Sequence, residues 1–192
     1  MKRNTTSRAR LLAAAEGVFY ARGIATTSVD VVARTAHVAK PTLYAHFPSK
    51  SALAAAALES RHTRRTEELR ARLAHAEPGE PRLRAVFSWL ASCYRHDNDR
   101  GCAFLNAAAE SPADELVTAA VRDEKLWLLS TLVQLSEDAG LVGPAGLASQ
   151  LMLLIDGVAG RVLVHGPDAA AEATAAASHA AGVLIEAARR HP

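Results

Sequence analysis

Apolar residues near the start of the chain recur every three or four positions, which is the period of a helix with one buried face. The first run extends from Arg8 to Arg22, and Gly23 follows it where a helix commonly ends. Its inward-facing positions are Leu11, Leu12, Ala15, Val18 and Phe19. The spacing therefore predicts an amphipathic helix over residues 8–22.

A second helix is predicted from Thr27 to about Ala36. The hydroxyl of Thr27 is expected to cap the first free N–H groups, and Asp30, three residues later, completes a pattern like a capping box. Its inner face consists of Val29, Val32 and Ala33. The helix is expected to end before a short link over residues 37–39.

A third, very short helix is predicted from Lys40 to about His46, with Pro41 tolerated because it lies in the first turn. Leu43 and Phe47 are four residues apart and face the core, which leaves a polar outer face. Two helices joined by a turn of three or four residues form a helix-turn-helix. A short second helix, braced by the first, can enter the major groove of DNA, which is about 12 Å wide.

The rest of the chain continues as helices. Ser49 is expected to cap a long fourth helix that reaches about His75, and the Pro- and Gly-containing stretch 77–81 breaks the pattern. Further helices are predicted over Leu83–Arg95, Cys102–Glu110, Asp114–Ala139 and Leu147–Val164, and from residues 166–168 to residues 189–191. We therefore expect an all-α protein of about nine helices.

Composition supports this fold class. The 192 residues include 42 alanines, and alanine is the strongest helix former. No apolar stretch approaches the ~18 uncharged residues that a membrane span needs, so we expect no membrane protein. Residues 1–6 lead into no signal-peptide core, and two cysteines cannot build a disulfide framework, so we expect a cytoplasmic protein.

The net charge of +2 conceals an asymmetry. Residues 1–50 hold eight basic and two acidic side chains, whereas residues 51–192 hold 14 basic and 18 acidic ones. A basic N-terminal region on a mildly acidic body suggests a nucleic-acid reader joined to a second function. A solvated basic surface without a partner is the alternative that charge alone leaves open.

The stretches Thr26–Ala33 and Val38–Lys50 resemble the DNA-binding domain of the tetracycline-repressor (TetR) family. The resemblance covers residues 8 to about 58 and includes Phe19, Gly23 and the Thr-Leu-Tyr-x-His-Phe box that starts at Thr42. It implies a DNA-binding domain over residues 1–58, with a connecting helix to about 75. Effector binding and dimerisation would then belong to residues 81–192.

Two positions depart from the family pattern. His37 stands where the family usually has Gly, so this residue must adopt the left-handed conformation or the turn must adjust. Ala39 replaces the usual Ser and so removes a cap from the third helix. Neither change is expected to abolish DNA binding.

The resemblance also implies roles for individual residues. Contacts to phosphates are expected from Thr27, Ser28, Tyr44 and Lys50. Contacts to bases, or to the adjoining backbone, are expected from Lys40, Pro41, Thr42 and His46. Tyr44 as a half-buried packing residue, Thr27 as a simple helix cap and His46 at the rim of the core remain alternatives.

The leading functional hypothesis is a homodimeric regulator, most simply a repressor that a small-molecule effector releases from a palindromic operator. The last two helices offer small and apolar residues for a seam that pairs into a four-helix bundle. The predicted seam residues are Leu151, Leu154, Val158, Gly160, Val162, Ala176, Ala180, Val183 and Leu184. A role in the core of a single chain is the alternative.

An effector pocket is predicted among the helices Leu83–Arg95, Cys102–Glu110 and Asp114–Ala139. Its candidate lining residues are Phe87, Leu90, Tyr94, Phe104, Asn106, Trp127 and Leu128. Such sites are mostly apolar with a few placed polar groups, and no charged residue is in this set. We therefore expect a neutral or weakly polar ligand, although ordinary core packing must explain many of these side chains.

An enzyme is not expected, because the chain shows no phosphate-binding glycine loop, nucleophile elbow or useful pairing of carboxylates with His. No cofactor is expected either. The alternative is a regulator that responds to metal or thiol chemistry through Cys93, His96 and Cys102. The spacing lacks paired Cys-x-x-Cys motifs, so Cys93 as a small buried apolar residue competes with this reading.

Overall fold

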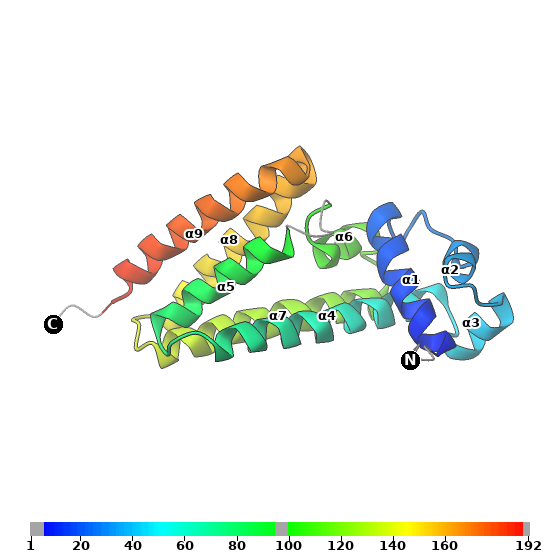
Figure 1. The fold of residues 1–192 in the computed structure, drawn as a ribbon, viewed down its shortest axis with the longest axis horizontal. Coiled ribbons are helices and arrows are strands. Elements are labelled where there is room, and N and C mark those ends of the chain that lie inside the picture. The colour runs from blue at the N-terminus through cyan, green and yellow to red at the C-terminus, as the bar shows by residue number, and fades with distance from the viewer. Residues whose placement is uncertain (1–5, 95–99, 190–192) are drawn as a thin grey trace. The chain divides into compact units, whose positions relative to one another are not determined.

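The computed structural model describes residues 6–94 and 100–189, and within these ranges its regular elements are all helical (Figure 1). The bounds are α1 Ser7–Arg22, α2 Val29–Thr35, α3 Lys40–His46, α4 Lys50–Ala74, α5 Glu80–Cys93, α6 Ala103–Glu110, α7 Glu115–Asp138, α8 Pro144–His165, the 3₁₀ turn η1 Pro167–Ala169 and α9 Ala170–Ala187. The prediction of an all-α fold with about nine helices is confirmed, and the predicted ends differ from these by a few residues.

The chain forms two compact units, each built from separated segments. The first, called the head unit below, comprises residues 1–64 and 103–124, and the second, the body unit, comprises residues 65–102 and 125–192. Helices α4 and α7 each contribute residues to both units. The predicted helix-turn-helix domain, residues 1–58, lies wholly in the head unit, which also takes in α6.

The head unit encloses the side chains that the helical spacing marked as inward. Leu11 of α1, Val32 of α2 and Leu43 of α3 have no exposed surface, and Phe19 and Phe47 are also buried. Burying a side chain of this size contributes about 1.5–3 kcal/mol, so these positions hold three short helices in one arrangement. The outer face of α3 is therefore free to carry function rather than stability.

The start of α2 corrects one prediction. The N-cap is Ser28, not Thr27, and Ser28 makes no hydrogen bond from its side chain to the helix. Thr27 is 3% exposed, and its hydroxyl is buried without a hydrogen-bond partner. The predicted capping box was wrong because Thr27 occupies the position before the cap, where side chains commonly pack inward.

In the turn between α2 and α3, the structure shows the first of the two alternatives predicted for His37. His37 has a φ of 53° and lies in the left-handed region, where a non-glycine residue carries strain of about 1–2 kcal/mol. The N–H of Val38 donates to the carbonyl oxygen of Ala33 at 3.0 Å and closes the turn. Ala39 gives α3 no side-chain cap, whereas the Ser49 hydroxyl accepts from the N–H of Ala52 at 3.0 Å at the start of α4.

In the body unit, α8 and α9 pack together and α5 packs against α9. The core includes Leu83, Phe87 and Leu90 of α5 together with Leu132 of α7 and Ile185 of α9. Lys125 of α7 pairs with Asp156 of α8 at 2.5 Å, and both side chains are partly buried. This unit therefore has a core of its own.

Contrary to the expectation from the sequence, helix α8 is long and apolar enough to cross a membrane by length and composition. Seven of its residues are buried within the chain: Leu147, Ala148, Leu151, Ile155, Val158, Ala159 and Val162. Burial along one face, and the ion pair of Asp156, fit a core helix of a folded unit. Its other face has exposed apolar residues.

The end of the last helix also differs from the prediction. Helix α9 stops at Ala187, and residues 190 and 191 lie outside the described residues. The guanidinium of Arg189 donates to both carboxylate oxygens of Glu80, each at 2.6 Å, and pairs with Glu186 at 2.7 Å. Arg189 is therefore tied to Glu80, the first residue of α5, by a bidentate ion pair.

Candidate nucleic-acid interface

The short helix α3 presents a polar, accessible face. Lys40, Pro41, Tyr44 and His46 are exposed and Thr42 is half-buried, while Leu43 alone among its residues is buried. These are the side chains for which the sequence predicted contacts to DNA. The backbone of α3 is held from below by Leu43 and by Phe47, which follows the helix.

Lys40 is the first residue of α3 and forms an ion pair with Asp30 of α2. Its ammonium lies 2.9 Å from one carboxylate oxygen of Asp30 and 3.2 Å from the other. The hydrogen bond that Lys40 donates to Asp30 raises the pKa of Lys40 above its ordinary value, and the carboxylate's charge adds to the effect. The lysine therefore stays positively charged at physiological pH.

The predicted phosphate-binding residues differ in how accessible they are and in whether they already make contacts within the chain. Ser28 and Tyr44 are exposed, and Tyr44 keeps 43% of its surface accessible. Lys50 donates to the carbonyl oxygen of Ala25 at 3.1 Å, so its ammonium also ties α4 to the segment after α1. Thr27 is buried and offers no surface to a phosphate.

Arg8 is a basic residue near this face that sequence reasoning did not single out. Its guanidinium lies over the ring of Phe47, 5.4 Å from the centroid, although 39 residues separate the two in sequence. The imidazole of His46 lies 6.3 Å from the same ring. Only the fold brings α1 to the end of α3, so spacing along the chain gave no signal.

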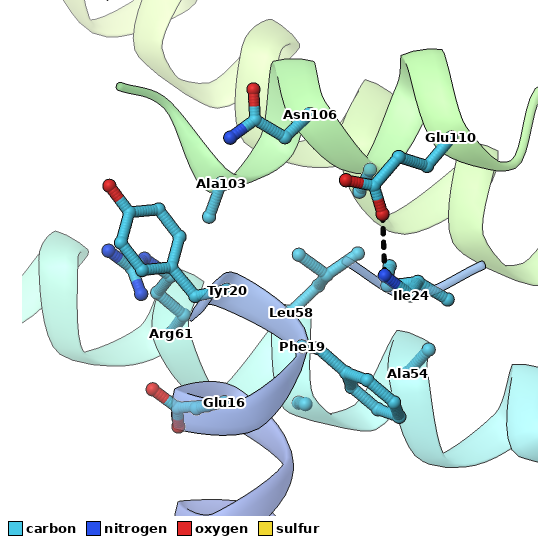
Figure 2. Close-up of a pocket in the computed structure, with 12 residues that line it drawn as sticks. Glu16, Phe19, Tyr20, Ile24, Ala54, Leu58, Arg61, Ala103, Asn106 and Glu110 are labelled. Atoms are coloured by element: carbon cyan, nitrogen blue, oxygen red, sulfur yellow. Dashed lines mark hydrogen bonds between the residues drawn. The ribbon is translucent and has the colours of Figure 1, made fainter. Parts of the chain in front are cut away.

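A second polar contact fixes α6 against the end of α1 (Figure 2). The Glu110 carboxylate accepts a hydrogen bond of 2.5 Å from the backbone N–H of Ile24. A Cβ on Gly23, whose φ is 90°, would lie 2.9 Å from that carboxylate. Glycine is thus required here both for the backbone conformation and for the approach of Glu110.

A small pocket opens beside this contact in the head unit. Figure 2 shows Tyr20 and Arg61 at one side of it and Asn106 at another, and the Arg61 guanidinium lies 4.9 Å from the Tyr20 ring centroid. Asn106 was predicted to line an effector site, and here it lines this pocket. Phe104 is 1% exposed and fills the interior instead.

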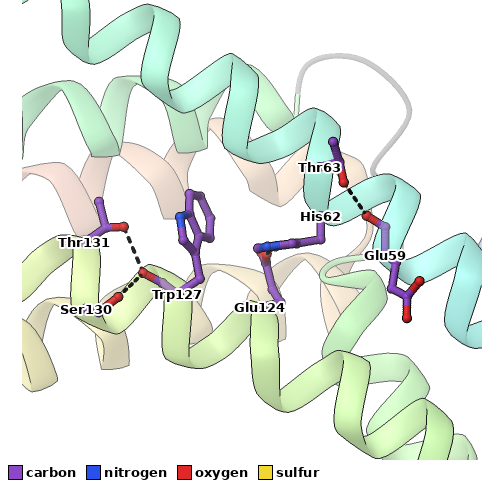
Figure 3. A network of polar contacts seen from close by, with 7 residues as sticks. All are labelled: Glu59, His62, Thr63, Glu124, Trp127, Ser130 and Thr131. Atoms are coloured by element: carbon purple, nitrogen blue, oxygen red, sulfur yellow. Dashed lines mark hydrogen bonds and ion pairs between the residues drawn. The ribbon is translucent and has the colours of Figure 1, made fainter.

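The other predicted effector residues belong to the body unit. Phe87, Leu90 and Leu128 are each 2% exposed, and Tyr94 and Trp127 are partly buried against the same core. The backbone carbonyl of Trp127 accepts from the hydroxyls of Ser130 and Thr131 (Figure 3). The seven predicted lining residues are therefore split between the two units.

A buried carboxylate was missed by the sequence analysis. Glu124 of α7 is 2% exposed and lies 2.5 Å from Nδ1 of His62 on α4 (Figure 3). It stands in the charged run from Arg122 to Lys125, which reads as a solvated face. Buried carboxylates need such a partner, because an uncompensated charge in the interior is costly.

The cysteines show one notable contact. The Arg65 guanidinium donates to Sγ of Cys93 at 3.6 Å and lies over the ring of Trp89 at 4.5 Å. Cys102 is partly exposed, and His96 falls outside the described residues. Within residues 6–94 and 100–189, no three His, Cys, Asp or Glu side chains are grouped to hold a metal.

The predicted seam residues point in different directions. Leu151, Val158 and Val162 are buried in the chain's own core, and Leu154 and Leu184 pack against it. Gly160, Ala176 and Val183 are exposed, and Ala180 lines a groove between α8 and α9. The predicted seam thus combined residues from two faces of the same helices, because both faces are apolar.

The known proteins that this chain resembles are transcriptional regulators. The family model described as bacterial regulatory proteins, tetR family, matches residues 11–57. A probable HTH-type transcriptional regulator, ArpR of Pseudomonas putida, is 38% identical over 77 residues, which are 40% of this chain and 34% of that protein. The HTH-type transcriptional activator FasR of Mycolicibacterium smegmatis is 35% identical over 91 residues, covering 47% and 42%.

These curated relatives match over less than half of their own length. The match to a solved structure extends much further. The crystal structure of a TetR-family transcriptional regulator from Streptomyces coelicolor has a TM-score of 0.87 and 29% identity, with 96% of each chain covered. The likeness thus includes the fold beyond the helix-turn-helix.

Proposed function

Because the chain belongs to the TetR family of bacterial transcriptional regulators, we propose that it acts as a homodimeric repressor released from a palindromic operator by a small-molecule effector. The chain is a DNA-binding regulator and not an enzyme. The observation that carries the proposal is the accessible polar face of α3 above the buried anchors Leu43 and Phe47. Its site of action is the cytoplasm.

We assign base contacts to the exposed side of α3, namely Lys40, Pro41, Thr42 and His46. Phosphate contacts are assigned to Ser28, Tyr44 and Lys50, because hydroxyl and ammonium donors suit phosphate oxygens. Thr27 is left out of this set, since its hydroxyl is buried.

Homodimerisation is supported by the outer face of α8 and α9. Leu153, Val164 and Val183 are 72%, 75% and 57% exposed, and Leu153 lines a groove together with Gly157 and Ala176, among others. Large apolar residues gathered on a surface mark an interface. A two-fold axis would pair both helices with their copies in a four-helix bundle, and DNA half-sites would follow the same symmetry.

The experiment that tests this function is selection of duplexes from a random DNA library by the purified protein. We expect an enriched palindrome whose half-sites lie about 34–36 Å apart, or a multiple of that distance. Sedimentation of the protein alone should show a dimer. Selection that enriches no sequence would overturn the proposal, and so would a monomer that binds single half-sites.

The effector is proposed to be neutral or weakly polar and to contact the body unit at Tyr94 and Trp127. These two side chains are only partly buried, and they pack against the apolar core that includes Phe87, Leu90 and Leu128. Trp127→Ala should keep operator binding and lose induction. Because truncating a large aromatic costs about 3–5 kcal/mol, the folded state of that variant must be verified first.

A thiol-responsive regulator is the second candidate, favoured by the contact between Arg65 and Cys93. A guanidinium beside a thiol favours the reactive thiolate, and stacking on Trp89 holds the guanidinium in place. Treatment with iodoacetamide should then weaken operator binding of the wild type and of Cys102→Ser, but not of Cys93→Ser. Equal loss in all three proteins, or loss in none, would exclude Cys93 as the sensor.

A further inference from the structure

The ion pair between Asp30 and Lys40 joins the two helices of the helix-turn-helix at its surface. Both carboxylate oxygens of Asp30 lie within 3.2 Å of the ammonium, at 2.9 and 3.2 Å. The lysine side chain is 50% exposed and the aspartate 54%. The pair therefore offers donor and acceptor groups, side by side, to whatever approaches α3.

Stability accounts for little of this aspartate's role, since its place in the first turn of α2 adds only about 0.3–1 kcal/mol through the helix dipole. Ion pairs at such exposure are worth only about 0–1 kcal/mol, because water screens both charges. Residues 1–50 contain two acidic residues, Glu16 and Asp30, against eight basic ones. Glu16 is largely buried and pairs with Arg64 of α4 at 2.8 Å, so Asp30 is the exposed acid of this basic region.

A carboxylate at a surface that meets DNA repels phosphates and lowers affinity for every sequence alike. It is useful there only if it improves discrimination. Lysine donates to O6 and N7 of guanine in the major groove, and aspartate accepts from the N4 amino group of cytosine. A Lys–Asp pair is thus complementary to the two halves of one guanine–cytosine base pair.

We propose that Asp30 and Lys40 act together as a specificity-determining pair that reads one guanine–cytosine base pair in each operator half-site. Asp30 keeps the Lys40 ammonium directed at the base edge and prevents it from settling on a phosphate. The pair also penalises DNA that lacks the cytosine amino group, because the carboxylate then loses water without gaining a donor. This proposal rests on the proposed DNA-reading role of α3.

The test uses the duplex selected by the wild-type protein, its set of single-base-pair substitutions, and one unrelated duplex of the same length. Affinities are measured by fluorescence anisotropy from 50 to 300 mM KCl for the wild type and three variants, Asp30→Asn, Asp30→Glu and Lys40→Gln. Glu59→Gln serves as the matched control, because it removes the same charge from an exposed residue of α4 in the head unit. Circular dichroism verifies that each variant is folded.

For Asp30→Asn we expect tighter binding to the unrelated duplex and a salt slope steeper by about 0.9, since the released lysine neutralises one phosphate. Preference for one guanine–cytosine pair per half-site should fall roughly five- to a hundredfold. Lys40→Gln should lose preference at the same base pair, and Asp30→Glu should retain it. Glu59→Gln should leave the preference unchanged.

A structural role for Asp30 would instead weaken binding to all duplexes equally, without moving the preference at any position. That result overturns the inference, as does an unchanged profile for Asp30→Asn when Lys40→Gln alters it. Failure of the underlying function looks different, because the wild type would then select no sequence at all.

Discussion

The head and body units place their functional residues under different constraints. On α3 the buried residue is the apolar Leu43, and the exposed face carries the polar side chains of Lys40, Tyr44 and His46 beside the smaller Pro41 and Ala45, so the two faces differ in character. On α8 both faces are apolar: Leu151 is fully buried whereas Leu153, two residues later, is 72% exposed. The sequence pattern therefore separates the two faces of α3, but it does not distinguish a core from an interface where both are made of the same kinds of residue.

The largest effect is expected from a charge on the proposed dimer face. Leu153→Glu should bury an unpaired carboxylate in the seam and weaken dimerisation by about 3–5 kcal/mol. Operator affinity should fall with it, while the fold survives because the side chain is exposed in the single chain. Sedimentation velocity measures the dimer directly.

The matched control is Leu126→Glu, which changes a leucine of α7 that is 56% exposed in the body unit. This variant should remain dimeric and bind the operator normally. An intact dimer in Leu153→Glu would move the seam away from α8 and α9.

The next effect concerns the contact between α1 and α6 within the head unit. Gly23→Ala should destabilise the protein by about 1–3 kcal/mol, because a φ of 90° strains alanine and the new Cβ meets Glu110. Glu110→Ala should cost a similar amount by leaving the N–H of Ile24 without its acceptor. Urea denaturation gives both values.

Gly17→Ala supplies a control of opposite sign. Gly17 lies inside α1, and nothing within 4 Å obstructs a Cβ there. The substitution should therefore stabilise the protein by up to about 1 kcal/mol. If Gly23→Ala behaved like Gly17→Ala, the constraint that we assign to Gly23 would be absent.

A smaller and more selective effect is expected on α3. Tyr44→Phe removes a proposed phosphate contact and should lower affinity for all duplexes alike, by roughly tenfold for a hydrogen bond to a charged group. Thr42→Ala should instead change the preference between duplexes. Anisotropy titrations with operator and unrelated DNA separate the two results, and the same loss pattern for both variants would refute this assignment.

The smallest effect is expected from the ion pair that ties Arg189 to α5. The hydrogen bond from Arg189 lowers the pKa of Glu80 below its ordinary value. A lowered pKa stabilises the fold above the pKa of the unfolded chain, and this contribution disappears as the pH falls through the folded value. The stability difference between wild type and Glu80→Gln should therefore be present at neutral pH and vanish in acid.

Thermal unfolding from neutral to acidic pH measures that difference. The effect should be small, because the Arg189 side chain is 46% exposed. A difference that grew on acidification would show that the pair does not act as described.

Much of the head unit was predictable, since its signals are local. The bounds of α3, the left-handed His37 and the uncapped Ala39 all follow from residues within a few positions of one another. The predicted cap at Thr27 failed because burial under the neighbouring helices, and not local hydrogen bonding, decides that side chain.

The unpredicted features depend on contacts between distant segments. Glu110 meets Ile24 across 86 residues, and Glu124 is buried beside His62 across 62. Nothing in the sequence around Glu110 or Glu124 distinguishes these two glutamates from ordinary surface residues. The candidate effector residues were chosen by helical spacing, which cannot assign Asn106 to one unit and Trp127 to the other.

In the proposed complex, two copies of α3 read the major groove of one palindrome. Protection of guanine N7 from dimethyl sulfate reports on this directly, because N7 lies in the major groove. Wild-type protein on the selected duplex should protect guanines in both half-sites, and Lys40→Gln should restore their reactivity. Protection of a single half-site, or a bound complex with no guanine protected by the wild type, would contradict the account.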